Sequence, residues 1–245
     1  SPARETSPEQ YPGVWELPEQ FQAQADGNWP FQEEDCAAKS LRFPENSSNL
    51  KRTPLVASNR RTWTFSFWIK RSDLGVNNNV LNTQDGVGST PRGGLGFSTN
   101  GFRAGFNTTG SSWNVGVTAN GDHNDPSAFL NVVTACDTTA AVASDRIRIW
   151  INGEERGYSE TTYPSLDMQL PINQALEHTL GNAHGANLGC RALLSEIHFI
   201  DGQALSPEAF GFFDGQGIWQ PKRFTGDYSS GPVYSNLGKF NTGNS

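Results

Sequence analysis

The chain has 245 residues, of which 35% are hydrophobic and 18% are charged, with 26 glycines, 15 phenylalanines and 7 tryptophans. This composition favours many short strands and turns around an aromatic core, and it argues against a helical bundle. The formal net charge of −7, without a basic block, argues against nucleic-acid binding. No stretch is long and apolar enough to span a bilayer.

The first part of the chain, residues 1–38, is predicted to be an extended arm. Residues 1–10 are polar, and residues 18–25 form a predicted short helix that ends at an Asp-Gly pair. The arm is too short to build a core of its own. We therefore expect it to dock, on its own domain or on another subunit, through four apolar rings: Trp15, Phe21, Trp29 and Phe31.

From residue 39 onward the hydrophobic period is two, and residues 62–70 give the clearest predicted strand. Trp68 breaks the alternation of that strand, and it has two interpretations: a ring packed under a loop, or a ring on which a sugar stacks. The core-facing positions of this strand are Trp63, Phe65, Phe67 and Ile69, and the opposite positions are Thr64, Ser66 and Lys70.

Two Asn-Gly pairs, at residues 100–101 and 152–153, predict β-hairpins. Glycine alternates with bulky residues on both sides of the first pair, which indicates a face that another sheet or a ligand approaches closely. Residues 129–135 and 147–151 are further predicted strands. Residues 193–200 form another, with Leu193, Ile197 and Phe199 on one face and Glu196 and His198 on the other, and a short helix is predicted from Ser206-Pro207-Glu208. Such spacing favours an antiparallel two-sheet β-sandwich.

Four stretches carry a resemblance to a known family. They are SLRF (40–43), NRRTWTFSFWIKRS (59–72), DTTAAVASDRIRIWINGEE (137–155) and the run 193–224, which includes FIDGQALSPEAFG and GIWQPK. Together they resemble the concanavalin A-like, laminin-G-like lectin domains of bacteriophage virion proteins, especially those of marine phages. The resemblance implies an all-β jelly roll of two curved antiparallel sheets. We expect this lectin domain over residues 39–226, followed by a tail or linker over residues 227–245.

Proteins of this fold also include glycoside hydrolases of the laminarinase type, which need two carboxylates on one strand face. Glu196 is the one acid within the predicted strand 193–200, and His198 stands two residues on. Asp201 lies five residues from Glu196, about 16 Å along a strand and on the opposite face. Glu196 and His198 are therefore interpreted as a solvated polar face, and the domain is expected to be non-catalytic.

No sequence pattern for a cofactor is present, and neither a nucleophile elbow nor a Walker loop occurs. The histidines have no spacing suited to a metal, and a calcium ion at the rim of the domain is the remaining alternative. The simpler interpretation of the oxygen-rich loop at residues 119–126 is a solvated turn. The isolated histidines are His123, His178 and His184, and the candidate calcium ligands are Asp122, Asn124 and Asp125.

The cysteines fit no zinc motif, and we interpret Cys36, Cys136 and Cys190 as free thiols, with one disulfide among them as the alternative. Low cysteine use agrees with folding in a reducing cytoplasm. Asn131 stands where domains of the resembling family usually carry the histidine of a Trp-x-His motif, which puts any role of that histidine in doubt here.

The sequence predicts a non-catalytic virion protein that recognises host-surface glycans from a tail fibre or spike. The alternatives are a capsid or tail decoration protein without glycan binding, and a glycan hydrolase. Expected partners are other virion subunits, copies of the same chain and host glycans, with neither nucleic acid nor membrane, after assembly in the host cytoplasm. The candidate sugar-binding rings are Trp68 and Trp113.

Overall fold

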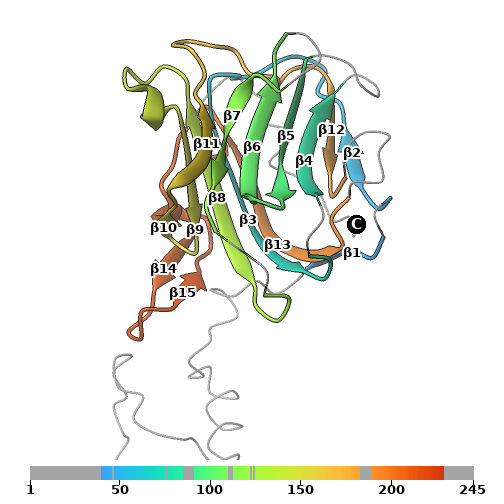
Figure 1. Ribbon diagram of the computed structural model, residues 1–245, viewed down its shortest axis with the longest axis vertical. Helices are drawn as coiled ribbons and strands as arrows, with labels where there is room; N and C mark the ends of the chain where they lie inside the picture. Colours follow the sequence, from blue (N-terminus) through green and yellow to red (C-terminus); the bar gives the residue numbers. More distant parts are fainter. Residues whose placement is uncertain are drawn as a thin grey trace, which may run out of the picture.

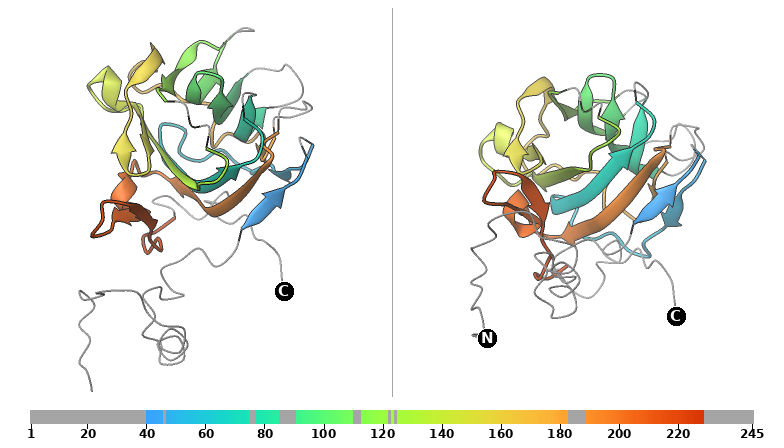
Figure 2. Two further views of the ribbon diagram at one scale, coloured as in Figure 1. Left: turned by 60° about the horizontal axis from the view of Figure 1, so that its bottom comes forward. Right: turned by 90° about the horizontal axis from the view of Figure 1, so that it is seen from below.

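The computed structural model describes residues 40–45, 47–74, 77–84, 91–109, 113–121, 123, 125–182 and 189–228. The predictions for the arm (Trp15, Phe21, Trp29, Phe31), for Cys36, Asp122, Asn124 and His184, and for most of the tail fall outside these residues. The described part is built almost entirely of antiparallel strands in two facing sheets (Figures 1 and 2). The predicted all-β, two-sheet antiparallel sandwich is therefore confirmed.

The six-stranded sheet has the order β1-β13-β3-β8-β9-β10, with antiparallel pairing throughout. Its centre is β3, which pairs with β13 on one side and β8 on the other. The strands are β1 (Leu41–Phe43), β3 (Thr62–Arg71), β8 (Leu130–Asp137), β9 (Ile147–Ile151), β10 (Glu154–Glu155) and β13 (Ala192–Asp201).

The seven-stranded sheet has the order β11-β7-β6-β5-β4-β12-β2 and is also antiparallel. It lies opposite the first sheet, with β5 and β6 near its middle (Figure 1). The strands are β2 (Leu50–Arg52), β4 (Asn78–Gln84), β5 (Arg92–Ser98), β6 (Gly101–Asn107), β7 (Val115–Ala119), β11 (Tyr158–Thr162) and β12 (Glu177–Leu180).

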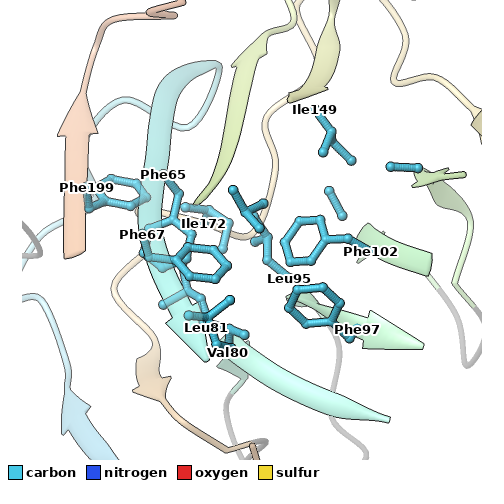
Figure 3. Packing of buried hydrophobic residues seen from close by; sticks show 14 of the residues in the cluster. Phe65, Phe67, Val80, Leu81, Leu95, Phe97, Phe102, Ile149, Ile172 and Phe199 are labelled. Atoms are coloured by element: carbon cyan, nitrogen blue, oxygen red, sulfur yellow. The ribbon is translucent and has the colours of Figure 1, made fainter. Parts of the chain in front are cut away.

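The main core fills the space between the two sheets and is rich in aromatic rings (Figure 3). The four core-facing side chains predicted for β3, Trp63 to Ile69 in alternation, are all fully buried. Aromatic rings of β3 contact rings of β6 in the space between the two sheets. The ring centroids of Phe67 and Phe102 are 6.0 Å apart, and those of Trp63 and Phe106 are 6.2 Å apart. These contacts join the two sheets and confirm the predicted phase of β3.

A second apolar cluster covers the outer face of the six-stranded sheet. It joins Val133, Trp150 and Ile200 of the sheet to Phe210 of the C-terminal segment. Thr64 and Ser66 are buried beneath this segment, and the Thr64 hydroxyl donates to the Gln203 carbonyl over 2.7 Å. The opposite face of β3 is polar but faces protein instead of water, because residues 201–228 fold back over it.

The predicted phase of the 193–200 strand is only partly correct. The register of β13 shifts between Ser195 and His198, and Glu196 has a positive φ of 44°. Such a β-bulge adds residues to one strand and changes which side chains face the core. As a result Leu194, not Leu193, occupies the core, and Ile197 is only partly buried beside the fully packed Phe199.

Both predicted Asn-Gly turns are confirmed. The first joins β5 to β6, and the second joins β9 to β10, where Asn152 and Gly153 both have positive φ values. The short helix predicted after Ser206 is a single 3-10 turn, η2 (Pro207–Ala209), and Ser206 makes no side-chain cap. It leads into a small hairpin of β14 (Gly211–Phe213) and β15 (Trp219–Pro221), and another 3-10 turn, η1 (Ala143–Asp145), precedes β9.

Two of the three cysteines lie in the described residues, and both are buried free thiols, as predicted. Burial raises the pKa of the Cys190 thiol to about 12 and also raises the pKa of Cys136. Such thiols are unreactive and act as small apolar side chains. None of the helical segments described is long and apolar enough to cross a membrane.

Candidate functional site

The outer face of the seven-stranded sheet has a floor of glycines. Gly94 of β5 pairs with Gly105 of β6, which pairs in turn with Gly116 of β7. Leu95, the next residue on β5, is fully buried in the core, so Gly94 faces outward. A Cβ atom added at Gly94 or Gly105 would lie 3.4 Å from the ring of Trp113. The missing side chains therefore allow an indole to lie directly on the sheet.

Trp113 is the aromatic side chain that occupies this floor. The residue is 39% exposed, in contrast to the many buried aromatic residues of the core. The guanidinium carbons of Arg92 and Arg103 lie 4.9 and 5.7 Å from its ring centroid, within the range of cation–π attraction. Two cations and the sheet thus hold an indole whose remaining surface is open to solvent.

The backbone next to Trp113 is fixed by the side chain and main chain of Asn114. The Asn114 N–H donates to the Phe106 carbonyl over 3.1 Å, and its Oδ1 accepts from the Thr108 N–H over 3.0 Å. The Asn114 amide also donates to the hydroxyls of Thr108 and Thr109. This network ties the start of β7 to the end of β6, so the indole is positioned before any ligand arrives.

Two hollows flank the indole and share Trp113 and Arg103 as common walls. The first has a volume of about 180 Å³, and the second has a volume of about 300 Å³. In the second, the Thr118 hydroxyl donates to the Glu160 carboxylate over 3.1 Å. The first is also lined by Asn77, Asn79, Gly94, Gly96, Phe97, Ser98 and Gly105, and the second by Val115, Gly116, Thr118, Glu160, Thr161 and Thr162.

Glu196 and His198 do not form the solvated face predicted from the sequence. His198 is only 8% exposed, because its ring packs among Phe210 and Phe224 of the segment that covers the six-stranded sheet. Its Nε2 lies 3.2 Å from Glu196 Oε2, and its Nδ1 lies 2.9 Å from the Tyr228 hydroxyl. The hydrogen bond with His198 lowers the pKa of the Glu196 carboxyl. The pair anchors the C-terminal segment.

Asp201 is likewise built into the fold. It is 3% exposed, and its carboxylate accepts hydrogen bonds from the Ser58 hydroxyl and, over 2.8 Å, from the Asn173 amide. Burial raises the pKa of this carboxyl. Asp201 therefore joins the end of β13 to two loops.

Of the three candidate calcium ligands, Asp125 alone lies within the described residues. Asp125 Oδ1 accepts from the backbone N–H and the hydroxyl of Ser127 over 2.7 and 2.6 Å, as in an ordinary Asx turn. These hydrogen bonds lower the pKa of Asp125. Within the described ranges no group of three or more His, Cys, Asp or Glu side chains is placed to hold a metal ion.

His178 is a buried structural histidine. Its Nε2 accepts from the Asn173 N–H over 3.2 Å, and its Nδ1 lies 2.9 Å from the Leu176 carbonyl, which requires a proton on Nδ1. Burial lowers the pKa of His178 to about 4, so the ring is neutral at physiological pH.

The other candidate ring, Trp68, lies on the outer face of the six-stranded sheet. It is 9% exposed, so its faces offer little surface to a ligand. Beside it on β8, Asn131 donates to the Phe67 carbonyl over 3.2 Å and accepts from the Trp219 indole over 3.0 Å. Asn131 thus fastens β15 to the sheet, a role that its sequence position alone did not indicate.

Trp113 was one of two candidate sugar-binding rings, whereas the residues around it were not predicted. The glycine alternation on both sides of the Asn100-Gly101 turn indicated a closely approached face, but it did not by itself connect that face with Trp113. Arg92 and Arg103 could not be assigned to that face, because their proximity to Trp113 depends on how β5 pairs with β6 and on where the chain places Trp113 before β7.

Comparison with known proteins gives structural likeness only. No protein-family model matches the chain, and no curated protein matches it. The mouse laminin α1 chain, domains LG4-5, is 13% identical, with a TM-score of 0.48 over 71% of this chain and 46% of that chain. The CBM40 of Ruminococcus gnavus IT-sialidase, bound to α2,3-sialyllactose, is 11% identical, with a TM-score of 0.48 over 69% and 93%. The SAP-like pentraxin of Limulus polyphemus is 11% identical, with a TM-score of 0.43 over 71% and 76%.

Proposed function

We propose that the protein is a non-catalytic glycan-binding module and that the Trp113 face binds the glycan. The observation that carries this proposal is the exposed indole lying on a glycine floor between two hollows. Sugar rings have apolar C–H faces that pack on an aromatic ring, and their hydroxyls need hydrogen-bonding groups around it. Asn79, Ser98 and Thr162 supply such groups within the two hollows.

The arrangement supports binding without cleavage. Glycoside hydrolysis by either common route uses two carboxyl groups, about 5–5.5 Å or about 6.5–9.5 Å apart. Among the described residues that line the two hollows, Glu160 is the one carboxylate. Glu196 is engaged with His198 beneath the C-terminal segment on the other sheet. Within the described lining of the two hollows, Glu160 therefore lacks the second carboxyl group that the reaction needs.

The proposed setting is a phage virion, where the module would recognise host-surface glycans from a tail fibre or spike. The sequence resemblance to phage lectin domains, which spans residues 40–226, supports this setting. Other virion subunits and further copies of the chain are the proposed partners, with assembly in the host cytoplasm.

A second candidate is a decoration or attachment protein that binds no glycan. It is favoured by an apolar patch on the β14–β15 hairpin, where Phe212, Phe213 and Ile218 are 46%, 49% and 54% exposed. Exposed apolar patches of this kind mark protein–protein contacts. The two roles are compatible, because the hairpin and the Trp113 face belong to different sheets of the domain.

The experiment is a glycan array probed with the full chain, followed by calorimetric titration of the best-bound oligosaccharide. Trp113→Ala should weaken binding by on the order of 10-fold or more, taking as a guide the loss of about 1–3 kcal/mol when an aromatic ring that stacks on a nucleobase is replaced by alanine. Phe129→Ala is the matched control: Phe129 is 40% exposed and also lies near a cation, Lys70 at 6.0 Å. Absence of any bound glycan, or equal losses in both variants, would overturn the proposal.

A further inference from the structure

We infer that the Trp113 face selects acidic saccharides, with a carboxylate or sulfate group of the sugar bound in the first hollow beside Arg103. This inference rests on the proposed glycan binding and adds the chemical class of the ligand. Its starting point is the placement of two arginines against one exposed indole, in a protein whose net charge is −7. Two positively charged side chains that lie close together in a protein with a negative net charge indicate a site for an anionic ligand.

Arg103 makes no ion pair within the part of the chain that the structure describes, and its Nε is buried without a hydrogen-bond acceptor. Arg61 and Arg148, by contrast, pair with Asp167 and Glu155. The guanidinium of Arg103 therefore carries a positive charge that no described carboxylate pairs with, and an anionic oxygen would complement this charge. Guanidinium groups suit carboxylates and sulfates, because their donors match two oxygens at once.

The two hollows differ in charge, which orients the ligand. The described residues that line the first hollow include Arg103 and no carboxylate. The second hollow contains the Glu160 carboxylate, which would repel a second anionic group. We therefore place the acidic sugar in the first hollow, beside Asn79 and Ser98, and a neutral sugar in the second, beside Thr162. Trp113 stands between them and packs against both.

The test uses an array of paired oligosaccharides: carboxylated members with their carboxyl-reduced forms, and sulfated members with their desulfated forms. The full chain should bind the acidic member of a pair about 10-fold more tightly or better, and this preference should shrink as salt rises. The carboxylate and sulfate pairs show separately which anionic group the site prefers. Arg103→Gln should weaken binding of the acidic member of each pair far more than binding of the neutral member, and Arg103→Lys should restore part of the preference.

Arg61→Gln is the control, because it removes an exposed arginine that is paired with Asp167 elsewhere on the surface. Thermal unfolding of each variant checks that the fold survives. Equal binding of acidic and neutral members by the wild-type chain would overturn the inference and leave the proposed function standing. Binding of no member at all would overturn both. A preference for acidic sugars that Arg103→Gln leaves intact would show that the anion binds elsewhere.

Discussion

The hydrogen bond between Asn131 and Trp219 should hold the β14–β15 hairpin to the six-stranded sheet. Trp219 is 7% exposed, and its ring fills the space above Gly153 and Gly211, where an added Cβ would lie 2.3 and 2.4 Å from it. Asn131→Ala removes the acceptor of the buried indole N–H as well as the hydrogen bond to the Phe67 carbonyl. We expect a loss of about 2–4 kcal/mol in the free energy of unfolding, since each buried unsatisfied group costs about 1–3 kcal/mol.

A double-mutant cycle isolates the shared bond. Trp219→Phe keeps an aromatic ring but removes the donor, so the loss in the double variant should be about 1–2 kcal/mol smaller than the sum of the single losses. Urea unfolding followed by far-ultraviolet circular dichroism is the assay, because it does not depend on tryptophan emission. The control is the double variant Trp113→Phe with Asn131→Ala. The two residues lie on opposite sheets, so their losses in the free energy of unfolding should add. Additivity of the Asn131 and Trp219 losses to within about 0.3 kcal/mol would refute the reasoning.

Four further outcomes are expected. Phe65→Ala, at a fully buried core position, should lower the free energy of unfolding by about 3–5 kcal/mol, and an unchanged urea midpoint would show that the phase of β3 is wrong. His178 has a pKa of about 4 when folded and about 6.5 when unfolded, so the unfolded chain binds more protons as the pH falls below 7. Wild-type stability should therefore drop by about 2 kcal/mol between pH 7 and pH 5, a slope that His178→Gln should flatten. Glu196→Gln should leave biological activity intact; release of reducing sugar by the wild type that this variant lacks would contradict the non-catalytic proposal. Deletion of residues 1–35 should leave thermal unfolding of the domain unchanged but prevent its incorporation into particles; loss of folding would instead indicate that the arm docks on its own domain, and normal results in both assays would mean that it has neither role.

The sandwich fold and its core could be predicted from the sequence, because the patterns that indicate them involve residues close together in the chain. The alternation from Trp63 to Ile69 and the two Asn-Gly turns depend on residues close together in the chain. The burial of Thr64 and the bulge at Glu196 were not readable, because both depend on contacts over long sequence distances. Thr64 is covered by Gln203, and the bulge is defined by pairing between β13 and β3.

The same contrast between local patterns and long-range contacts explains how much of the candidate site could be predicted. The sequence offered Trp113 as a candidate ring and the glycine alternation as a closely approached face, and the structure shows that the ring lies on that face. Arg103 and Glu160 can be assigned to that face only when the order of β11, β7 and β6 in the sheet is known. The hydrophobic period of the sequence does not give the order of strands. Trp68 shows the converse: its break in the alternation drew attention, yet its ring is 9% exposed.

The central claim, that a glycan binds on the indole of Trp113, can be tested at atomic resolution by nuclear magnetic resonance. The chain has seven tryptophans, so an ¹⁵N–¹H spectrum resolves a small set of indole N–H signals, which Trp113→Phe assigns. Titration with the tightest-binding acidic oligosaccharide should shift the Trp113 signal and leave those of the buried Trp63 and Trp219 in place. Saturating binding with an unmoved Trp113 signal would contradict the account.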